Sequence, residues 1–279
     1  MRVEDLDGPR VKAEAAKQML CELAWLGLSW EEPVIYQTQR TPAYREALEK
    51  LISIGAAYPC VCSRKDIEQA ASAPHSGEGE LAYPGTCCGR FTNVEVAESL
   101  SGRPVAWRLR VNSLPVAVKD YFATPKSYDL TKICGDFVIY KNDGTAAYQL
   151  AVVVDDEHSG VNAIVRGDDL LDSAARQIHL RRLLGFTGEI EYYHLPLVVG
   201  TDGRRLAKRH GDTRLAHYRA HGTTPKKILG LLGYWSGILS DRHPVEMDEL
   251  VEKFQLAKLP QKPIVFCQED EDFLTDKIR

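Results

Sequence analysis

The sequence Leu150-Ala151-Val152-Val153-Val154-Asp155-Asp156 carries the strongest single indication of the fold. Apolar residues rich in valine follow one another without a polar interruption, and the run ends in two aspartates. A short continuous run of this kind is typical of a strand that is covered on both faces, as in a parallel sheet. We therefore predict a buried parallel strand over residues 150–154 and an α/β fold around it.

Helical and strand patterns alternate before this run. Residues 11–26 carry apolar side chains at helical spacing, and residues 42–54 form a second amphipathic pattern with Thr41 as its expected cap. Residues 105–111 alternate apolar side chains with arginines such as Arg108, as in a half-buried strand. The alternation indicates α/β organisation.

The second half of the chain continues this pattern. Asp172 or Ser173 is expected to cap a helix that runs through Leu184, and Pro225 opens another that ends near Gly233. The C-terminal tail is mostly polar, with one short helix predicted near residues 245–254. We detect no internal repeat.

Composition restricts the class of protein. The chain has 279 residues, 44% of them hydrophobic and 27% charged, which is enough to bury a full core. The formal charge of −4 argues against non-specific coating of nucleic acid, so such contacts are expected at local basic patches, residues 176–182 and 204–209. No apolar run approaches the ~18 residues that span a bilayer. We expect a cytoplasmic protein without a membrane segment.

The cysteine pattern indicates a metal site. Seven cysteines suit metal ligation in a reducing compartment better than a disulfide framework. Three thiolates from two chain segments are placed to hold one tetrahedral, structural zinc: Cys60, Cys62 and Cys87. Chemistry alone leaves three candidates for the fourth ligand: Cys88, His75 and Tyr83. The alternative is a set of buried free thiols.

A basic loop indicates phosphate binding. The sequence Thr201-Asp202-Gly203-Arg204-Arg205-Leu206-Ala207-Lys208-Arg209-His210-Gly211-Asp212 sets four cationic side chains between glycines. Lysine is a mobile point charge and arginine a forked donor, so these side chains can neutralise a leaving pyrophosphate. Taken alone, such a loop is more often a solvated basic turn.

Five motifs in order resemble the class I glutamyl-tRNA synthetases. They are residues 2–10, 148–156, 165–170, 194–197 and 206–211. Within that family the chain is similar to the glutamyl-Q tRNA(Asp) synthetases, the short paralogues without an anticodon-binding domain. The resemblance implies a Rossmann-type catalytic domain and selects Tyr83 as the fourth zinc ligand.

The resemblance also implies roles for individual residues. Glu4, Tyr148 and Arg166 match positions that bind glutamate, where Arg166 suits a carboxylate and Glu4 an ammonium group. Lys208 matches a lysine of the loop that closes over ATP, and is therefore expected to be catalytic and ATP-binding. Without the family, each of these side chains has an ordinary structural explanation: an ion pair, a core aromatic ring or a terminal carboxylate.

The sequence departs from the family pattern in two places. Arg205 replaces the first basic residue of the ATP loop and Ala207 replaces its usual serine. The His-x-Gly-His motif of class I synthetases is expected one strand and one helix before Arg2, and nothing precedes Met1. We interpret this as truncation, because decay of the gene would not preserve the other site residues.

Together these observations predict a four-part organisation. The parts are a first Rossmann segment, a zinc-bearing insert, the rest of the catalytic domain and a small helical appendage, over residues 1–57, 58–103, 104–235 and 236–279. The expected activity is ATP-dependent activation of glutamate, with Mg²⁺, and its transfer by a monomer to queuosine in the anticodon loop of tRNA(Asp). Two alternatives stay open: the catalytic part of an ordinary glutamyl-tRNA synthetase, and a non-catalytic module that binds zinc and tRNA.

Overall fold

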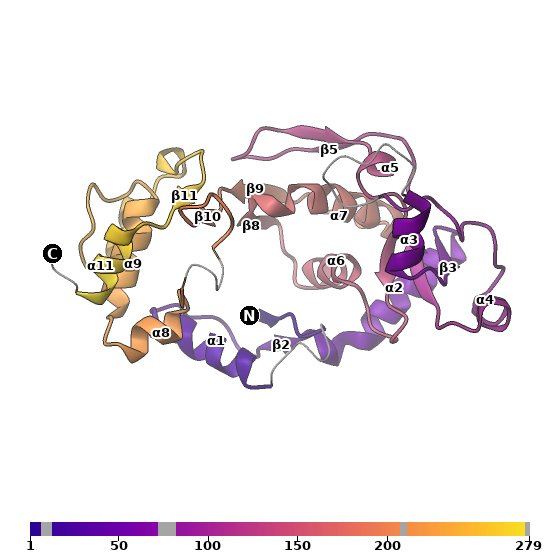
Figure 1. The fold of residues 1–279 in the computed structure, drawn as a ribbon, viewed down its shortest axis with the longest axis horizontal. Coiled ribbons are helices and arrows are strands. Elements are labelled where there is room, and N and C mark those ends of the chain that lie inside the picture. Colours follow the sequence, from indigo (N-terminus) through magenta and orange to yellow (C-terminus); the bar gives the residue numbers. More distant parts are fainter. Residues whose placement is uncertain (7–12, 72–81, 207–210, 277–279) are drawn as a thin grey trace. The chain divides into compact units, whose positions relative to one another are not determined.

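The computed structural model describes residues 1–6, 13–71, 82–206 and 211–276. The chain forms two compact units. The larger unit contains residues 2–8 and 35–194, and the smaller unit contains residue 1, residues 9–34 and residues 195–279. Figure 1 shows the elements of both units.

The larger unit combines helices with several small sheets, which confirms the predicted mixed α/β class. In chain order its elements are β1 (Arg2–Val3), β2 (Ile35–Tyr36), the 3₁₀ helix η2 (Gln37–Arg40), α2 (Thr41–Ser53), β3 (Ala57–Cys60), α3 (Arg64–Ala71), α4 (Val94–Ser101), β4 (Ala106–Leu109), β5 (Val116–Val118), β6 (Lys126–Tyr128), α5 (Leu130–Ile133), β7 (Phe137–Tyr140), α6 (Tyr148–His158), β8 (Ala163–Gly167), the 3₁₀ helix η3 (Asp168–Leu170), α7 (Leu171–Leu184) and β9 (Glu191–Leu195). Strands β1 and β2 pair in parallel, whereas β3, β4 and β7 form an antiparallel sheet.

The smaller unit is mainly helical. Its elements are α1 (Ala13–Trp25), β10 (Val198–Val199), α8 (Leu215–Ala220), α9 (Pro225–Trp235), α10 (Met247–Lys253), the 3₁₀ helix η5 (Leu256–Lys258), β11 (Ile264–Val265) and α11 (Gln268–Thr275). Helix α9 ends at Trp235, two residues after the predicted end near Gly233. Its glycines lie inside the helix, where they allow neighbouring segments to pack closely. A Cβ at Gly230 would lie 1.9 Å from the His243 carbonyl oxygen, and one at Gly233 would lie 2.6 Å from Leu250.

The Val-rich run is a helix, so the predicted parallel strand over residues 150–154 is wrong. These residues form the middle of α6, and all five are at most 3% exposed. A helix that is apolar on every face must be buried on every face. Helices α2 and α7, which are labelled with α6 in Figure 1, and strand β7 pack against α6 and supply that cover. Tertiary burial therefore overrides the β-propensity of valine.

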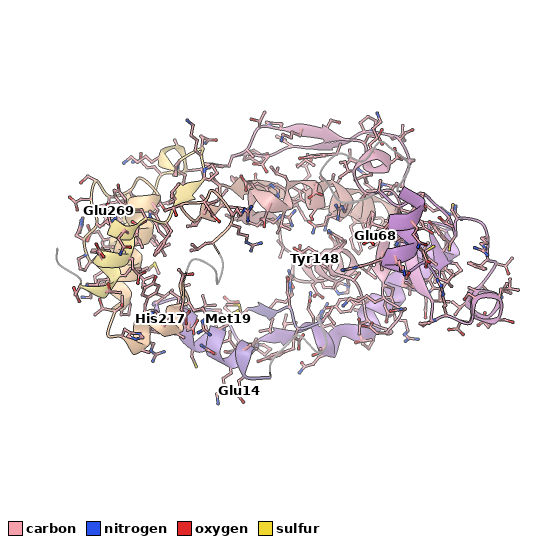
Figure 2. All side chains as sticks on the ribbon, viewed as in Figure 1. Glu14, Met19, Glu68, Tyr148, His217 and Glu269 are labelled. Atoms are coloured by element: carbon pink, nitrogen blue, oxygen red, sulfur yellow. The ribbon has the colours of Figure 1, made fainter. Side chains whose placement is uncertain are left out.

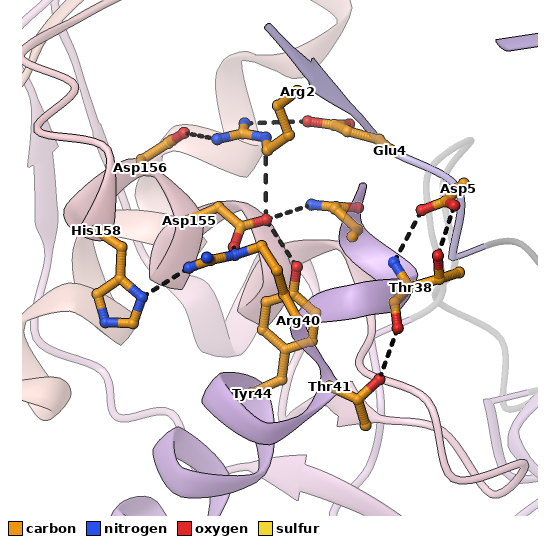
Figure 3. A network of polar contacts seen from close by, with 11 residues as sticks. Arg2, Glu4, Asp5, Thr38, Arg40, Thr41, Tyr44, Asp155, Asp156 and His158 are labelled. Atoms are coloured by element: carbon orange, nitrogen blue, oxygen red, sulfur yellow. Dashed lines mark hydrogen bonds and ion pairs between the residues drawn. The ribbon is translucent and has the colours of Figure 1, made fainter. Parts of the chain in front are cut away.

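The buried carboxylate of Asp155 anchors α6. It is 1% exposed and accepts hydrogen bonds from Gln37 Nε2 at 2.9 Å, Arg40 Nε at 2.5 Å and Tyr44 OH at 2.7 Å (Figure 3). The neighbouring Asp156 accepts from Arg2 Nη1 at 2.7 Å. Because a buried charge is stable only when it is paired and hydrogen-bonded, these donors hold β1, η2 and α2 to the end of α6.

Three further sequence predictions need correction. Arg40, and not Thr41, is the N-cap of α2, and Thr41 is the first helical residue. Leu170, and neither Asp172 nor Ser173, is the N-cap of α7. The tail contains α11 and β11 in addition to the predicted helix, because Phe266 and Leu274 bury apolar surface against the smaller unit's core.

In the part of the chain that the structure describes, no helix is long and apolar enough to cross a membrane.

Replacing Asp155 by Asn tests the anchor, since it removes the charge and keeps the volume. The Arg40 guanidinium loses its ionised partner, so we expect the free energy of unfolding in urea to fall by about 3 kcal/mol, the lower end of the range for a broken buried ion pair. The control is Asp143→Asn in the exposed turn before α6, where the Asp143 carboxylate accepts a hydrogen bond from the Thr145 backbone N–H. Its free energy of unfolding should change by less than about 0.5 kcal/mol. Equal small losses in both variants would contradict the anchoring role.

Candidate functional site

Three thiols of the insert converge on one point. The Sγ atoms of Cys60, Cys62 and Cys87 lie within 4.8 Å of one another, and those of Cys62 and Cys87 are 3.4 Å apart. Cys60 is the last residue of β3. Cys87 lies in a turn of a later segment of the chain, which returns to the end of β3. Sulfurs bound to one tetrahedral zinc at about 2.3 Å lie roughly 3.8 Å apart. The three thiols therefore fit one tetrahedral ion.

The phenol of Tyr83 lies beside these three thiols. Its phenol oxygen lies 3.4 Å from Cys60 Sγ and 3.5 Å from Cys62 Sγ, and it accepts a hydrogen bond from the Cys87 backbone N–H at 2.9 Å. The Tyr83 backbone is fixed against Gly135, where an added Cβ would lie 2.3 Å from the Tyr83 carbonyl oxygen. The phenol oxygen is thus held where a fourth ligand would stand.

The two other candidates for the fourth ligand differ. Cys88 is exposed and accepts a hydrogen bond from Arg110 Nη1 at 2.6 Å, away from the three clustered thiols. His75 lies outside the described residues. The geometry in the described part of the chain therefore favours Tyr83.

A buried arginine lies beside the thiols, contrary to the exposed side predicted for the arginines of this strand. Arg108 in β4 is 7% exposed, and its guanidinium stacks 3.8 Å from the centroid of the Tyr83 ring. Its Nε donates to Cys60 Sγ at 3.3 Å and its Nη1 to the Asp136 carbonyl oxygen at 2.6 Å. A cation in this position stabilises negative charge on the cluster.

Burial opposes that negative charge. Desolvation raises the pKa of the Cys62 thiol to about 12, and desolvation likewise raises the pKa of the Tyr83 phenol. For Cys87 desolvation also acts upward, but hydrogen bonds from the Val61 backbone, Tyr83 and the other thiols hold its pKa below the usual value. Since metal-bound ligands are deprotonated, a bound cation would reverse the effect of burial on Cys62 and Tyr83.

The residues predicted to bind glutamate all belong to the larger unit. Tyr148, labelled in Figure 2, is the first residue of α6, Glu4 follows β1, and Arg166 lies in β8. The Tyr148 side chain is exposed, at 42% of its surface. Burial raises the pKa of the Tyr148 phenol, the Arg166 charge lowers it and the Glu4 charge raises it. Tyr148 is therefore close enough to interact with both charged side chains, and Glu4 in turn accepts from Arg2 at 3.1 Å.

The guanidinium of Arg166 donates hydrogen bonds to three groups of the protein. Its Nε donates to His194 Nε2 at 3.0 Å, its Nη1 to Gln177 Oε1 at 2.9 Å and its Nη2 to the Leu170 carbonyl oxygen at 3.2 Å. His194 Nδ1 lies 2.5 Å from Asp120 Oδ2. The guanidinium plane is therefore fixed, which suits it to forked binding of a carboxylate.

Little in the amino-acid pattern indicated these supporting residues. Gln177 Nε2 donates to Gln149 Oε1 at 3.0 Å, and Gln149 Nε2 donates to Ser173 Oγ at 3.1 Å. His194 stood within a recognised motif, but its partner Asp120 is 74 residues away. Only the folded chain connects these positions.

The basic loop is only partly described. Lys208 and Arg209 lie outside the described residues. Before them, the chain makes a tight turn in which Gly200 N–H donates to the Arg204 carbonyl oxygen at 2.8 Å, and Arg205 pairs with Val199. Arg204 and Arg205 are exposed. Two of the four predicted cationic side chains thus project from the arm of a hairpin in the smaller unit.

The second predicted basic patch is mostly engaged in internal contacts. Arg181 is 6% exposed and donates to Glu157 Oε2 at 2.7 Å and to the Gly188 carbonyl oxygen at 3.0 Å. Arg176 donates to Asp172 Oδ2 at 2.7 Å. Of the arginines at 176–182, Arg182 is exposed. The prediction of a nucleic-acid patch at these residues is therefore wrong for Arg181.

Several known proteins of similar sequence share one description. A glutamyl-Q tRNA(Asp) synthetase of Symbiobacterium thermophilum is 42% identical over 274 residues, covering 95% of this chain and 84% of the relative. The corresponding protein of Rhodopirellula baltica is 39% identical over 284 residues, covering 95% and 85%. That of Geobacter sulfurreducens is 46% identical over 216 residues, covering 77% and 66%.

Solved structures agree in fold. A glutamate tRNA ligase from Elizabethkingia meningosepticum, solved with its amino acid, superposes with a TM-score of 0.79, and a glutamate-tRNA synthetase from Elizabethkingia anophelis with 0.81. Each is 22% identical, and the match covers 99% of this chain and 62% of the other. The model of the family described as tRNA synthetases class I (E and Q), catalytic domain, matches residues 1–272. The chain therefore belongs to the class I (E and Q) tRNA synthetase catalytic-domain family.

Proposed function

We propose that this protein activates glutamate with ATP and transfers the glutamyl group to the queuosine of tRNA(Asp). The observation that carries the proposal is its 42% identity, over 95% of the chain, to a relative named glutamyl-Q tRNA(Asp) synthetase. Ligase activity agrees with membership of the synthetase family. In this proposal the protein acts as a monomer in the cytoplasm.

The glutamate site is proposed around Arg166. The guanidinium binds a carboxylate of the substrate, Glu4 attracts its ammonium group, and Tyr148 lines the same region. The fixed hydrogen bonds of Arg166 support this role, because a forked donor that is already oriented loses little entropy on binding.

Lys208 is proposed as the catalytic residue of the ATP loop. Its ammonium group stabilises negative charge that develops on the phosphates as pyrophosphate leaves, with Mg²⁺ bound to ATP. The exposed Arg204 and Arg205 support a phosphate-binding role for this loop, because both lie in the turn that leads to Lys208.

We propose a structural zinc ion held by Cys60, Cys62, Tyr83 and Cys87. The convergence of three thiols and one phenol oxygen supports this ligand set. When bound, zinc supplies a fixed cross-link between two chain segments, and no step of the reaction requires it. Arg108 reduces the net charge of a site with several anionic ligands.

The acceptor is proposed to be tRNA(Asp), at its anticodon loop. The choice of this tRNA is supported by relatives that match 95% of this chain and are named glutamyl-Q tRNA(Asp) synthetases. An ordinary glutamyl-tRNA synthetase is the alternative, and the structural similarity to such enzymes at 22% identity concerns the fold alone. Recognition of a single-stranded loop allows the wobble nucleotide to leave its stack and enter a catalytic cleft.

The zinc proposal predicts a difference between neighbouring substitutions. Cys62→Ser should release the metal and unfold the insert, because apparent binding energies of structural zinc sites are about 10–16 kcal/mol. Tyr83→Phe should weaken zinc retention against a chelator, whereas Cys88→Ser, which changes a thiol outside the cluster, should leave zinc content near that of the unchanged protein. Plasma mass spectrometry of the purified proteins measures zinc per chain. Full occupancy in Tyr83→Phe and loss in Cys88→Ser would reassign the fourth ligand.

The glutamate proposal predicts that Arg166→Lys raises the KM for glutamate, because lysine cannot form the forked contact. We expect a loss of about 2 kcal/mol in binding, the lower end of the range for truncating one partner of a desolvated charge pair, because lysine keeps the positive charge. Glutamate-dependent ATP–pyrophosphate exchange by the full gene product measures it. Arg182→Lys on the exposed side of α7 is the control.

Lys208→Ala should instead lower kcat with little change in the KM for glutamate. Equal effects of Arg166→Lys and Lys208→Ala on both constants would show that the roles are misassigned.

The acceptor proposal predicts where labelled glutamate appears. The full gene product should charge queuosine-containing tRNA(Asp) and its isolated anticodon stem-loop, because the accepting diol lies in that loop. It should not charge tRNA(Glu), and tRNA(Asp) without queuosine is the matched control. Radiolabel on tRNA(Glu) with none on the queuosine stem-loop would identify an ordinary glutamyl-tRNA synthetase.

A further inference from the structure

Asp120 and His194 form a buried pair directly behind Arg166. Both side chains are fully buried, and Asp120 Oδ2 lies 2.5 Å from His194 Nδ1. The other carboxylate oxygen accepts from the backbone N–H groups of Phe122 at 2.9 Å and Ala123 at 2.6 Å. Burial acts to raise the pKa of Asp120, but the hydrogen bonds with His194 and with these two backbone N–H groups outweigh it and lower the pKa, so the group is a carboxylate.

The hydrogen bonds identify the tautomer of His194. A guanidinium has N–H donors and no acceptor, so His194 Nε2, 3.0 Å from Arg166 Nε, must present a lone pair. The ring proton is then on Nδ1, where it is donated to the Asp120 carboxylate. In the other tautomer, the Nε2–H group would face the Arg166 N–H donor, and the Nδ1 lone pair would face the Asp120 carboxylate.

We propose that Asp120 and His194 are positioning residues for the substrate carboxylate. Asp120 holds His194 as the Nδ1–H tautomer, and His194 Nε2 then fixes the guanidinium of Arg166 in one plane. This inference rests on the proposed binding of glutamate at Arg166. It adds that glutamate affinity depends on a carboxylate that does not touch the substrate.

Energetic reasoning supports a role in affinity. An arginine side chain that is free to rotate loses several rotamers when it binds a carboxylate. Arg166 has its Nε, Nη1 and Nη2 each engaged on the protein side, to His194, Gln177 and Leu170. Its orientation is therefore fixed before substrate arrives, which is the usual source of affinity from preorganisation.

The direct test is Asp120→Asn. Asparagine has the same size, its oxygen can still accept from Phe122 and Ala123, and its amide can only donate to His194 Nδ1. The ring proton must then move to Nε2, where it opposes the Arg166 N–H. We expect the KM for glutamate in pyrophosphate exchange by the full gene product to rise roughly 10- to 100-fold, the effect of an unsatisfied buried donor. The kcat and the KM for ATP should change by less than about threefold, because ATP does not use this carboxylate contact.

Two further variants control for a purely structural effect. Asp129→Asn makes the same chemical change at a half-buried carboxylate that accepts from Thr131, and it should leave the KM for glutamate unchanged. His194→Gln offers Arg166 an oxygen acceptor that needs no tautomer, so its KM for glutamate should be lower than that of His194→Phe. Equal KM values for these two His194 variants would contradict the positioning role.

A measurement without substrate separates this inference from the proposed function. Nitrogen-15 NMR of the His194 ring should show Nδ1–H in the unchanged protein and Nε2–H in Asp120→Asn. An Nε2–H signal in the unchanged protein would overturn the inference, even if Asp120→Asn fails to fold. Absence of glutamate-dependent exchange in the unchanged protein would overturn the proposed function, while an unchanged glutamate KM in Asp120→Asn would overturn only the positioning role.

Discussion

The larger unit depends on the buried negative charge of Asp155. Asp155 is 1% exposed, and its carboxylate is satisfied by donors from η2 and α2, with the guanidinium of Arg40 as its ionised partner. Because an unpaired charge in this position would be strongly unfavourable, the segments that carry the donors must be in place when α6 is. Helix α6 rises ~1.5 Å per residue, so the anchor lies only ~10 Å from Tyr148 at its other end. One carboxylate therefore secures the helix whose first turn belongs to the proposed substrate site.

The sequence predicted local features better than distant ones. The mixed α/β class and the positions of most helices follow from short-range periodicity and from glycines such as Gly185, whose φ of 73° ends α7. The strand prediction at residues 150–154 failed because a fully apolar run is compatible with either structure, and the surrounding helices decide between them. Arg108 was expected on an exposed face and is buried, since neither a Tyr83 ring nor a thiol partner can be recognised from its own strand.

The candidate site divides in the same way. Residue types and spacing pointed to the thiols, which the fold brings together, and to Arg166 through a motif. The support of Arg166 could not be predicted, because Asp120 and His194 are 74 residues apart and neither belongs to a short pattern that specifies the other. Their pairing follows from the isolated bridge between Asp120 and Tyr192, which brings the two segments side by side. Supporting residues such as Asp120 can be recognised only from the folded topology, whereas the residue that they support, Arg166, can be recognised from a sequence motif.

The distance along the chain between Asp155 and its donors affects how the protein is made. Gln37, Arg40 and Tyr44 precede Asp155 by 118, 115 and 111 residues. At synthesis rates of about 5–20 residues per second, these donors leave the ribosome on the order of ten seconds before the carboxylate. Closing loops of this length also slows folding. During that interval η2 and α2 expose the surface that α6 will cover, so this surface is open to aggregation and to chaperones until α6 is synthesised.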